Sequence, residues 1–144
     1  MEKKQILVID NSGLSYIGSD INGPILRGTE TSLILLSEEL TKKNCDVFFA
    51  NKTNQEKSVN GVHYINEKNI NKEKTYDLAI AVSNANLFNK IKSVKKAIFS
   101  VSNQSLEKFL RKRQFISTYT HKPVIVTLCD YQFKKRSFLI KIIS

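Results

Sequence analysis

Residues 27–50 read RGTETSLILLSEELTKKNCDVFFA, and this stretch predicts a helix followed directly by a strand. Apolar residues within it recur at the spacing of one helix face: Leu33, Ile34, Leu35, Leu36 and Leu40. Charged residues lie toward the other side: Glu38, Glu39, Lys42 and Lys43. Such a pattern is typical of an amphipathic helix that packs its apolar face on a sheet. We therefore predict a helix from Thr31 to Lys43.

Both ends of this helix carry local signals. Thr29 is predicted to cap the amino end through its hydroxyl, and Glu30 places a carboxylate where the helix dipole favours it. Asn44 tolerates the left-handed backbone beyond the carboxyl end. An apolar run of strand length, Gln5–Asp10, precedes the helix, and Val47–Ala50 follows it. Strand, helix and strand in this order form a βαβ unit, which implies parallel strands.

The rest of the chain continues the alternation. Further strands are predicted at Gly61–Ile65, Tyr76–Val82, Lys96–Val101 and Pro123–Leu128, and further helices at Leu87–Lys92 and Ser105–Phe115. With 144 residues, 41% of them hydrophobic, the chain is long enough for one domain with a proper core. The predicted fold class is α/β: a three-layer, Rossmann-like open sheet of about five buried strands, mainly parallel, forming one domain over residues 1–144.

The composition limits the classes of protein to which this chain can belong. No apolar run approaches the length of a transmembrane helix, and Met1–Lys4 leads straight into a strand, so we expect a cytoplasmic protein. Cys45 and Cys129 lie beside or within predicted strands without metal-ligand spacing, which favours buried, reduced thiols and no metal site. The net charge of +10 points to anionic partners. Nineteen lysines against four arginines also indicate a compositional bias, under which part of this charge has no function.

The carboxyl ends of parallel strands mark the edge where open α/β sheets bind ligands. The loops predicted at this edge are Asn11–Gly28, Ser83–Asn86, Ser102–Gln104 and Cys129–Gln132. They offer hydroxyls, amides and glycine backbone, and few carboxylates or imidazoles. The first loop is unusually long for a connection inside a βα unit. We interpret it as a functional loop, with a surface insertion as the alternative.

Three common α/β motifs are absent from the sequence. No run has the glycine, four residues, glycine, lysine and serine or threonine of a Walker loop. Gly13 and Gly18 do not fall in the Gly-x-Gly-x-x-Gly fingerprint of dinucleotide-binding proteins. The first strand resembles that of a response-regulator receiver, but the strand ending Val82-Ser83-Asn84 lacks the phosphoacceptor aspartate. This absence argues against a receiver.

Two motifs carry a resemblance to a known family: Arg27-Gly28-Thr29-Glu30 opens the predicted helix, and Asn44-Cys45-Asp46-Val47 leads into the next strand. They resemble the Gly-Gly-x-Glu and Gly-His-x-Val motifs in the amino-terminal half of GT-B glycosyltransferases of the group one, or family four, type. Arg27 replaces the first glycine, and Asn44-Cys45 replaces the Gly-His pair. The Tyr-Asp-Leu and Lys-Pro-Val-Ile-Val strands fit the same pattern, so the resemblance covers nearly the whole chain.

The resemblance implies the acceptor side of sugar transfer from a nucleotide-sugar to a glycan or lipid-linked acceptor. Backbone N–H groups of Gly28 and Thr29 would face phosphate or sugar hydroxyls at the interdomain cleft. Arg27 would add a guanidinium for an anionic group, with a solvated arginine as the alternative. The substrate-binding residues predicted on this basis are Asn11, Arg27, Gly28, Thr29, Asn84, Ser102 and Asn103.

No catalytic residue is assigned from the sequence. Members of this family often carry a histidine after the fourth strand, where this chain reads Val101-Ser102-Asn103. His63 and His121 lie elsewhere and are interpreted as surface or structural residues. The family binds its donor in a carboxy-terminal half with paired glutamates, which 144 residues cannot hold beside the first half. We expect the chain to be inactive without such a half and to need no cofactor; the alternative is a non-catalytic α/β binding or regulatory domain.

Basic residues in two segments predict an anion-binding patch: Lys108, Arg111, Lys112, Arg113, Lys134, Lys135 and Arg136. Each basic side chain contributes about 1 kcal/mol near an anionic membrane. Such a patch would be useful to an enzyme with a lipid-linked acceptor, because it would bind the protein peripherally to the inner face of the membrane. A solvated basic face is the alternative. Aromatic residues occur near both segments without an RNA-binding signature, which disfavours nucleic acid as a partner.

Overall fold

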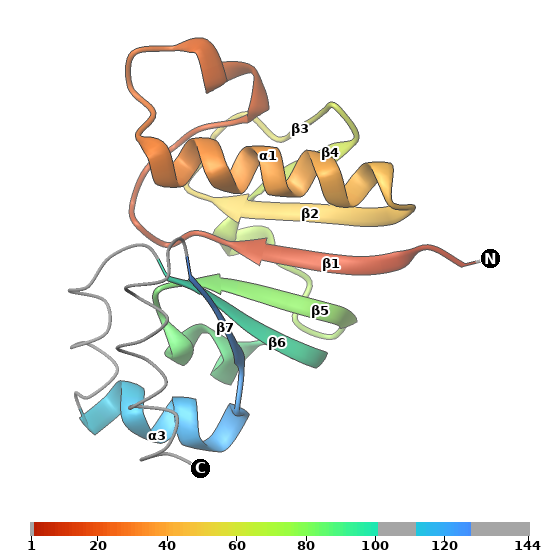
Figure 1. Ribbon diagram of the computed structural model, residues 1–144. Helices are drawn as coiled ribbons and strands as arrows, with labels where there is room; N and C mark the ends of the chain where they lie inside the picture. Colours follow the sequence, from red (N-terminus) through yellow and green to blue (C-terminus); the bar gives the residue numbers. More distant parts are fainter. Residues whose placement is uncertain (1, 101–111, 128–144) are drawn as a thin grey trace.

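The computed structural model describes residues 2–100 and 112–127. Within these residues, seven strands form one sheet in the order β3-β4-β2-β1-β5-β6-β7 (Figure 1). The strands are β1 (Lys4–Ile9), β2 (Cys45–Asn51), β3 (Lys57–Val59), β4 (Val62–Asn66), β5 (Thr75–Val82), β6 (Lys92–Ser100) and β7 (Val124–Thr127). The helices are α1 (Gly28–Lys42) and α3 (Lys112–His121), with short 3-10 helices η1 (Gly18–Asn22), η2 (Glu67–Asn69) and η3 (Ala85–Lys90).

The predicted α/β class and the mainly parallel, Rossmann-like open sheet are confirmed. All neighbouring strands pair in parallel except β3 and β4. Strand β1 lies between β2 and β5, and its side chains are buried on both faces of the sheet. Ile6 and Val8 pack on the side of α1, whereas Leu7 and Ile9 pack on the opposite side. Burial on both faces explains why this strand is a continuous apolar run instead of an alternating one.

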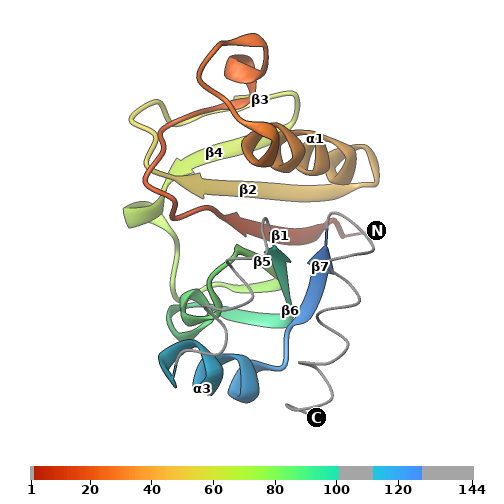
Figure 2. The same cartoon turned by 60° about the vertical axis from the view of Figure 1, so that its left-hand side comes forward.

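The sheet is the middle of three layers. Helix α1 lies on one face, and η3 with α3 lies on the other (Figure 1 and Figure 2). The outer contact between α3 and η3 includes a hydrogen bond of 2.6 Å from Ser117 Oγ to Asn86 Oδ1. His121 Nε2 donates to Asn89 Oδ1 at 2.7 Å. Burial and the nearby Lys96 charge lower the pKa of His121, so the neutral form that fits this contact is favoured.

Helix α1 begins earlier than predicted. It starts at Gly28 with Arg27 as its N-cap, so the predicted capping role of Thr29 is wrong. Glu30 occupies the third helical position, and its carboxylate accepts the Arg27 backbone N–H at 3.0 Å, which favours the earlier start. Leu35 is 49% exposed, so it does not widen the buried face as predicted. Asn44 has a φ of 61°, and the predicted left-handed residue after the helix is confirmed.

The second half of the chain differs from the predicted pattern in three places. The predicted helix Leu87–Lys92 is instead the 3-10 helix η3, which ends at Lys90. Strand β6 starts at Lys92, four residues before the predicted start, because it pairs along the whole of β5. Helix α3 continues to His121, beyond the predicted end at Phe115. Residues 105–111 of the predicted helix, and Val101 and Leu128 of the predicted strands, lie outside the described residues.

The hairpin of β3 and β4 was not predicted. Its two turn residues, Asn60 and Gly61, have φ angles of 49° and 83°. Two consecutive residues with positive φ, of types Asn and Gly, are the signature of the tight hairpin turn that matches strand twist. The Asn-Gly pair was therefore the available sequence signal. The hairpin takes the place of a helical connection between β2 and β4.

We expect Gly61→Ala to lower the free energy of unfolding by about 1–2 kcal/mol. A side chain at φ +83° is strained, and its Cβ would lie 3.3 Å from Cβ and Oγ1 of Thr41. Urea denaturation followed by circular dichroism measures the loss. Asn60→Gly is the control, because glycine adopts the same positive φ without strain. Equal stability of Gly61→Ala and the wild type would contradict this explanation of the turn.

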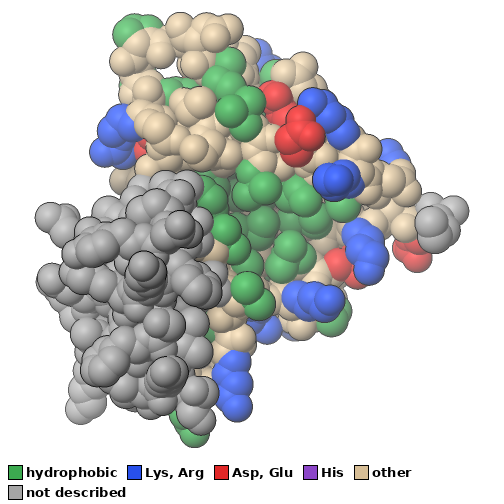
Figure 3. All heavy atoms as spheres, in the orientation of Figure 1, with side chains coloured by type: hydrophobic (Ala, Val, Ile, Leu, Met, Phe, Trp, Pro, Cys, Tyr) green, Lys and Arg blue, Asp and Glu red, His purple; other side chains and the backbone are tan. Residues whose placement is uncertain are grey.

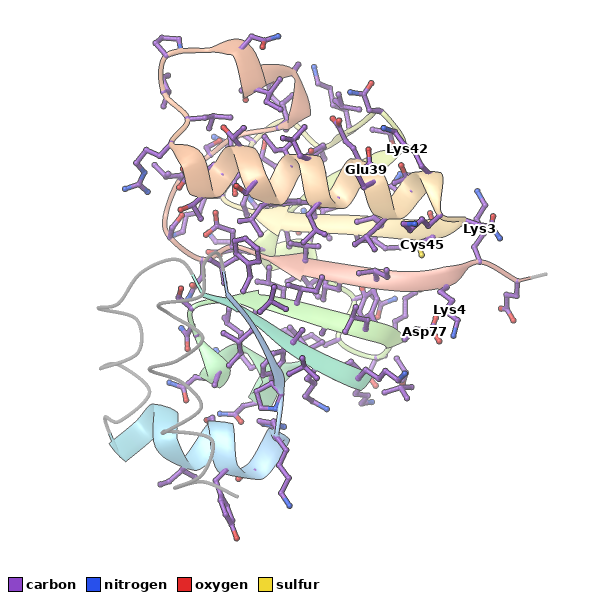
Figure 4. All side chains as sticks on the ribbon, viewed as in Figure 1. Lys3, Lys4, Glu39, Lys42, Cys45 and Asp77 are labelled. Atoms are coloured by element: carbon purple, nitrogen blue, oxygen red, sulfur yellow. The ribbon has the colours of Figure 1, made fainter. Side chains whose placement is uncertain are left out.

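The surface beside α1 and the amino edge of the sheet differ in character. Figure 3 shows hydrophobic side chains gathered on the surface of the sheet next to α1. Lys and Arg side chains lie toward the amino terminus. Figure 4 labels residues toward the amino ends of β1, β2 and β5 and the carboxyl end of α1: Lys3, Lys4, Glu39, Lys42, Cys45 and Asp77. Cys45 is a free, half-buried thiol, so its predicted full burial is wrong. Cys129 lies outside the described residues.

Candidate functional site

The carboxyl ends of β1 and β5 form the point where the strand order reverses direction. Helix α1 leads from β1 toward β2 on one face, whereas η3 leads from β5 toward β6 on the other (Figure 1). Rossmann-like sheets bind ligands in the crevice that opens between two such diverging connections. Asn11 and Asn84 follow these two strands, and Gly28 begins α1 at the same edge. These three predicted site residues therefore lie at the same edge of the sheet.

A buried polar cluster fixes the long loop between β1 and α1. The Tyr16 hydroxyl donates to Oδ2 of Asp10, and the Ser12 backbone N–H donates to Oδ1 of Asp10 at 2.9 Å. Tyr16 is 2% exposed and packs edge-on against Phe49, with ring centroids 5.6 Å apart. Burial and then the Asp10 carboxylate raise the pKa of Tyr16 far above its usual range. The phenol therefore stays protonated and holds Asp10 as its acceptor.

The same loop is tied to the end of β2. Nδ2 of Asn51 donates to the Tyr16 carbonyl at 2.8 Å, and Oδ1 of Asn51 accepts the Thr53 backbone N–H at 2.7 Å. Both Asn51 and Thr53 are buried. Sequence reasoning missed Asp10, Tyr16 and Asn51 as anchors of this loop. A polar residue directly after an apolar strand run was the available signal for Asp10 and Asn51.

An ion pair closes the amino end of α1. Nη2 of Arg27 lies 2.9 Å from Oε1 of Glu30, and the two side chains are 70% and 1% exposed. Burial alone would raise the pKa of Glu30, but hydrogen bonds from Arg27 and the backbone, together with the guanidinium charge, lower it. Glu30 therefore remains ionised in a buried position. Arg27 already has an intramolecular partner, and its contact with an anionic ligand stays a prediction.

The end of β5 has an unusual backbone conformation. Ser83 has a φ of 51°, in the left-handed region that non-glycine residues rarely adopt. Its Oγ is buried and has no hydrogen-bond partner among the described residues. The next residue, Asn84, uses Oδ1 to accept the Asn86 backbone N–H at 3.0 Å and caps η3. Strained backbone and an unpaired hydroxyl are common features of ligand sites, and sequence reasoning missed Ser83.

A hollow of about 430 Å³ opens at this edge, on the face of the sheet opposite α1. Its lining comes from the ends of β1 and β2, from η2 and the connection after it, and from η3 and the residue after it. The lining residues are Ile9, Asn11, Lys52, Glu67, Lys68, Ile70, Lys72, Leu87, Lys90 and Ile91. Asn11 is the one predicted site residue among them. The four lysines were not predicted, because they are far apart in the sequence and surrounded by other lysines.

A hydrogen-bonded chain of Ser58, His63 and Asp46 crosses β3, β4 and β2. Ser58 Oγ lies 2.7 Å from His63 Nδ1, and His63 Nε2 lies 3.0 Å from Asp46 Oδ1. The imidazole also stacks on Phe48, with ring centroids 5.2 Å apart. These contacts support the prediction that His63 is a structural residue, because each polar atom of its ring is engaged in holding neighbouring strands.

Several predicted residues fall where the structure does not describe them. Ser102 and Asn103 of the predicted substrate site, and Lys108, Arg111, Lys134, Lys135 and Arg136 of the predicted basic patch, lie outside the described residues. Lys112 and Arg113 begin α3, and only their backbone is described. The anion-binding patch therefore stays a prediction.

Within residues 2–100 and 112–127, no group of three or more His, Cys, Asp or Glu side chains is placed to hold a metal ion. In the same part of the chain, no helix has the length and apolar character needed to cross a membrane. Comparisons with protein-family models, curated proteins and solved structures found no match.

Proposed function

We propose that this chain is the acceptor-side half of a GT-B type glycosyltransferase. It would position a glycan or lipid-linked acceptor for sugar transfer from a nucleotide-sugar, which a separate donor-binding half would hold. The parallel strand order and the long, anchored connection between β1 and α1 support this proposal. So does the Arg27–Glu30 turn at the edge where Rossmann-like sheets bind ligands. Peripheral binding to an anionic membrane belongs to the same proposal.

The observation that carries the proposal is a glycine, Gly28, at a position that does not require one. It is the first residue of α1, directly after the N-cap Arg27. Among the described residues, nothing lies within 4 Å of where its Cβ would be, and its φ is outside the left-handed region. Neither packing against this part of the chain nor backbone conformation therefore requires glycine at this position. Close approach of a ligand to the backbone N–H groups of the first helical turn explains it.

We expect Gly28→Ala to leave stability unchanged or raise it by up to about 1 kcal/mol, while sugar transfer falls by about tenfold or more. The assay uses the chain co-expressed with a donor half, sought by translating the DNA after codon 144 in all three frames. Leu35→Ala, on the exposed side of α1, is the control and should leave sugar transfer unchanged. Full transfer activity in Gly28→Ala would remove the glycine as support for the proposal.

A non-catalytic binding domain is the second candidate function. At the described part of the edge, the carboxylates of Asp10 and Glu30 are buried and engaged with Tyr16, Ser12 and Arg27. Neither carboxylate is free to act as a general base. Ligand binding without sugar transfer, in the presence of the donor half, would favour this second candidate.

A further inference from the structure

We infer that the lysine-lined hollow is a binding site for a phosphorylated small molecule that also carries an apolar portion. The hollow lies on the face of the sheet opposite α1, so it is distinct from the glycine turn of the proposed transferase site. The inference does not require glycosyl transfer. Its chemistry follows from the charge of the rim, the character of the walls and the volume.

The rim of the hollow is strongly cationic. Lys52, Lys68, Lys72 and Lys90 line it, and among the described residues Glu67 supplies the one carboxylate. These lysines come from separate segments, after β2, in η2, after η2 and in η3, and the tertiary fold brings them to one opening. Ammonium groups held close together repel one another, and a multiply charged anion relieves that repulsion. Lysine ammonium groups bind phosphate as point charges.

Three of these lysines are available to a ligand. Lys52 Nζ lies 3.6 Å from Oε1 of Glu67 and is therefore partly neutralised. Among the described residues, Lys68, Lys72 and Lys90 form no ion pair. Most lysines in the described part of the chain likewise form no ion pair, and these three differ in lining one hollow together with Lys52. The hollow thus concentrates unneutralised positive charge.

The walls of the hollow are apolar. Ile9, Ile70, Leu87 and Ile91 line it, and they belong to the hydrophobic cluster on the face opposite α1. Asn11 adds one amide at the carboxyl end of β1, which suits hydrogen bonding to a hydroxyl or carbonyl. A volume of about 430 Å³ lies within the range of small-molecule sites. A planar base or a short hydrocarbon would lie on the walls while its phosphates reach the lysines.

Calorimetric titration of the full chain at low ionic strength tests this inference with three probes. These are uridine diphosphate, geranyl diphosphate and inorganic pyrophosphate. We expect one of the two organic diphosphates to bind saturably, about tenfold more tightly than pyrophosphate, because pyrophosphate has no apolar portion. A preference for uridine diphosphate identifies a nucleotide ligand, and a preference for geranyl diphosphate identifies a lipid-derived one. Absence of saturable binding for all three probes would overturn the inference.

Matched variants separate a built site from general electrostatic attraction. The combination of Lys68→Gln, Lys72→Gln and Lys90→Gln should weaken binding by about tenfold or more. A control with Lys3→Gln, Lys43→Gln and Lys57→Gln removes the same charge from exposed positions outside the hollow and should bind as the wild type does. Equal weakening in both triple variants would refute a localised site.

Glu67→Gln provides a change in the opposite direction. Removing this carboxylate frees Lys52, so diphosphate affinity should rise by about threefold. Unchanged or weaker affinity would show that the charges of the rim do not govern binding. The outcome is also separable from that of the proposed transferase. If the chain binds diphosphate but the chain co-expressed with a donor half shows no sugar transfer, the hollow remains a binding site and the proposed transferase fails. If transfer occurs, is unaffected by the triple lysine variant, and no diphosphate binds, the transferase stands and the hollow is not a site.

Discussion

Phe49→Ala is expected to lower the free energy of unfolding by about 3–5 kcal/mol. Phe49 is fully buried at the centre of β2, between α1 and the sheet core. Its ring lies 5.6 Å from that of Tyr16 and 5.3 Å from that of Tyr64. Truncation removes both aromatic contacts and leaves a cavity that the parallel strands on either side cannot close. The loss is a large fraction of the total stability of a typical domain.

Urea denaturation followed by circular dichroism and by tyrosine fluorescence measures this change, and coincident transitions justify a two-state treatment. Leu35→Ala is the matched control, because Leu35 is 49% exposed on α1 and should lose far less. If Phe49→Ala cost no more than Leu35→Ala, the core described around β2 would be wrong.

Tyr16→Phe is expected to lower the free energy of unfolding by about 2–3 kcal/mol. The substitution keeps the ring but removes the hydroxyl that donates to Asp10, leaving a buried carboxylate oxygen without that partner. Loss of the anchor should also increase hydrogen exchange in the connection from Asn11 to Arg27. Tyr119→Phe is the control, because Tyr119 is 56% exposed and should tolerate loss of its hydroxyl.

The Tyr16 contribution also has a defined pH dependence. Burial and Asp10 raise the pKa of Tyr16 in the folded state, so the folded protein retains a proton that the unfolded chain loses above pH of about 10. The wild type should therefore exceed Tyr16→Phe in stability up to that pH and lose the advantage as the pH rises further. A cycle with Asp10→Asn should be clearly non-additive, since the two side chains share one hydrogen bond. Additive losses would show that the pair does not act as a unit.

Local sequence patterns were sufficient for the central elements of the fold. The apolar run of β1 and the stripe containing Leu33 predicted the first βαβ unit, and Asn44 marked the end of its helix. Thr29 and Leu35 were misassigned, because the cap and the buried face depend on where Glu30 and the sheet lie. For the predicted site, simple topology was enough to place Asn11 and Gly28 at the carboxyl edge of the sheet.

Features that depend on pairing between distant segments were not predictable in the same way. Strand β6 begins at Lys92 only because β5 offers a partner along its whole length. The strained conformation of Ser83 follows from its position between β5 and η3 and from its backbone hydrogen bond to Phe99. No local pattern distinguishes a serine in this conformation from any other loop serine.

Hydrophobic periodicity was enough to predict the α/β class and the first βαβ unit, because it reports which face of each element is buried. The edge at which ligands should bind is a prediction from the same pattern, because parallel strands place their carboxyl ends together. The meeting of four lysines around one apolar hollow is visible only once the chain is folded: Lys52, Lys68, Lys72 and Lys90. That meeting depends on strand order and on the side taken by each connection, which are set by long-range packing and not by the residues on either side of each lysine.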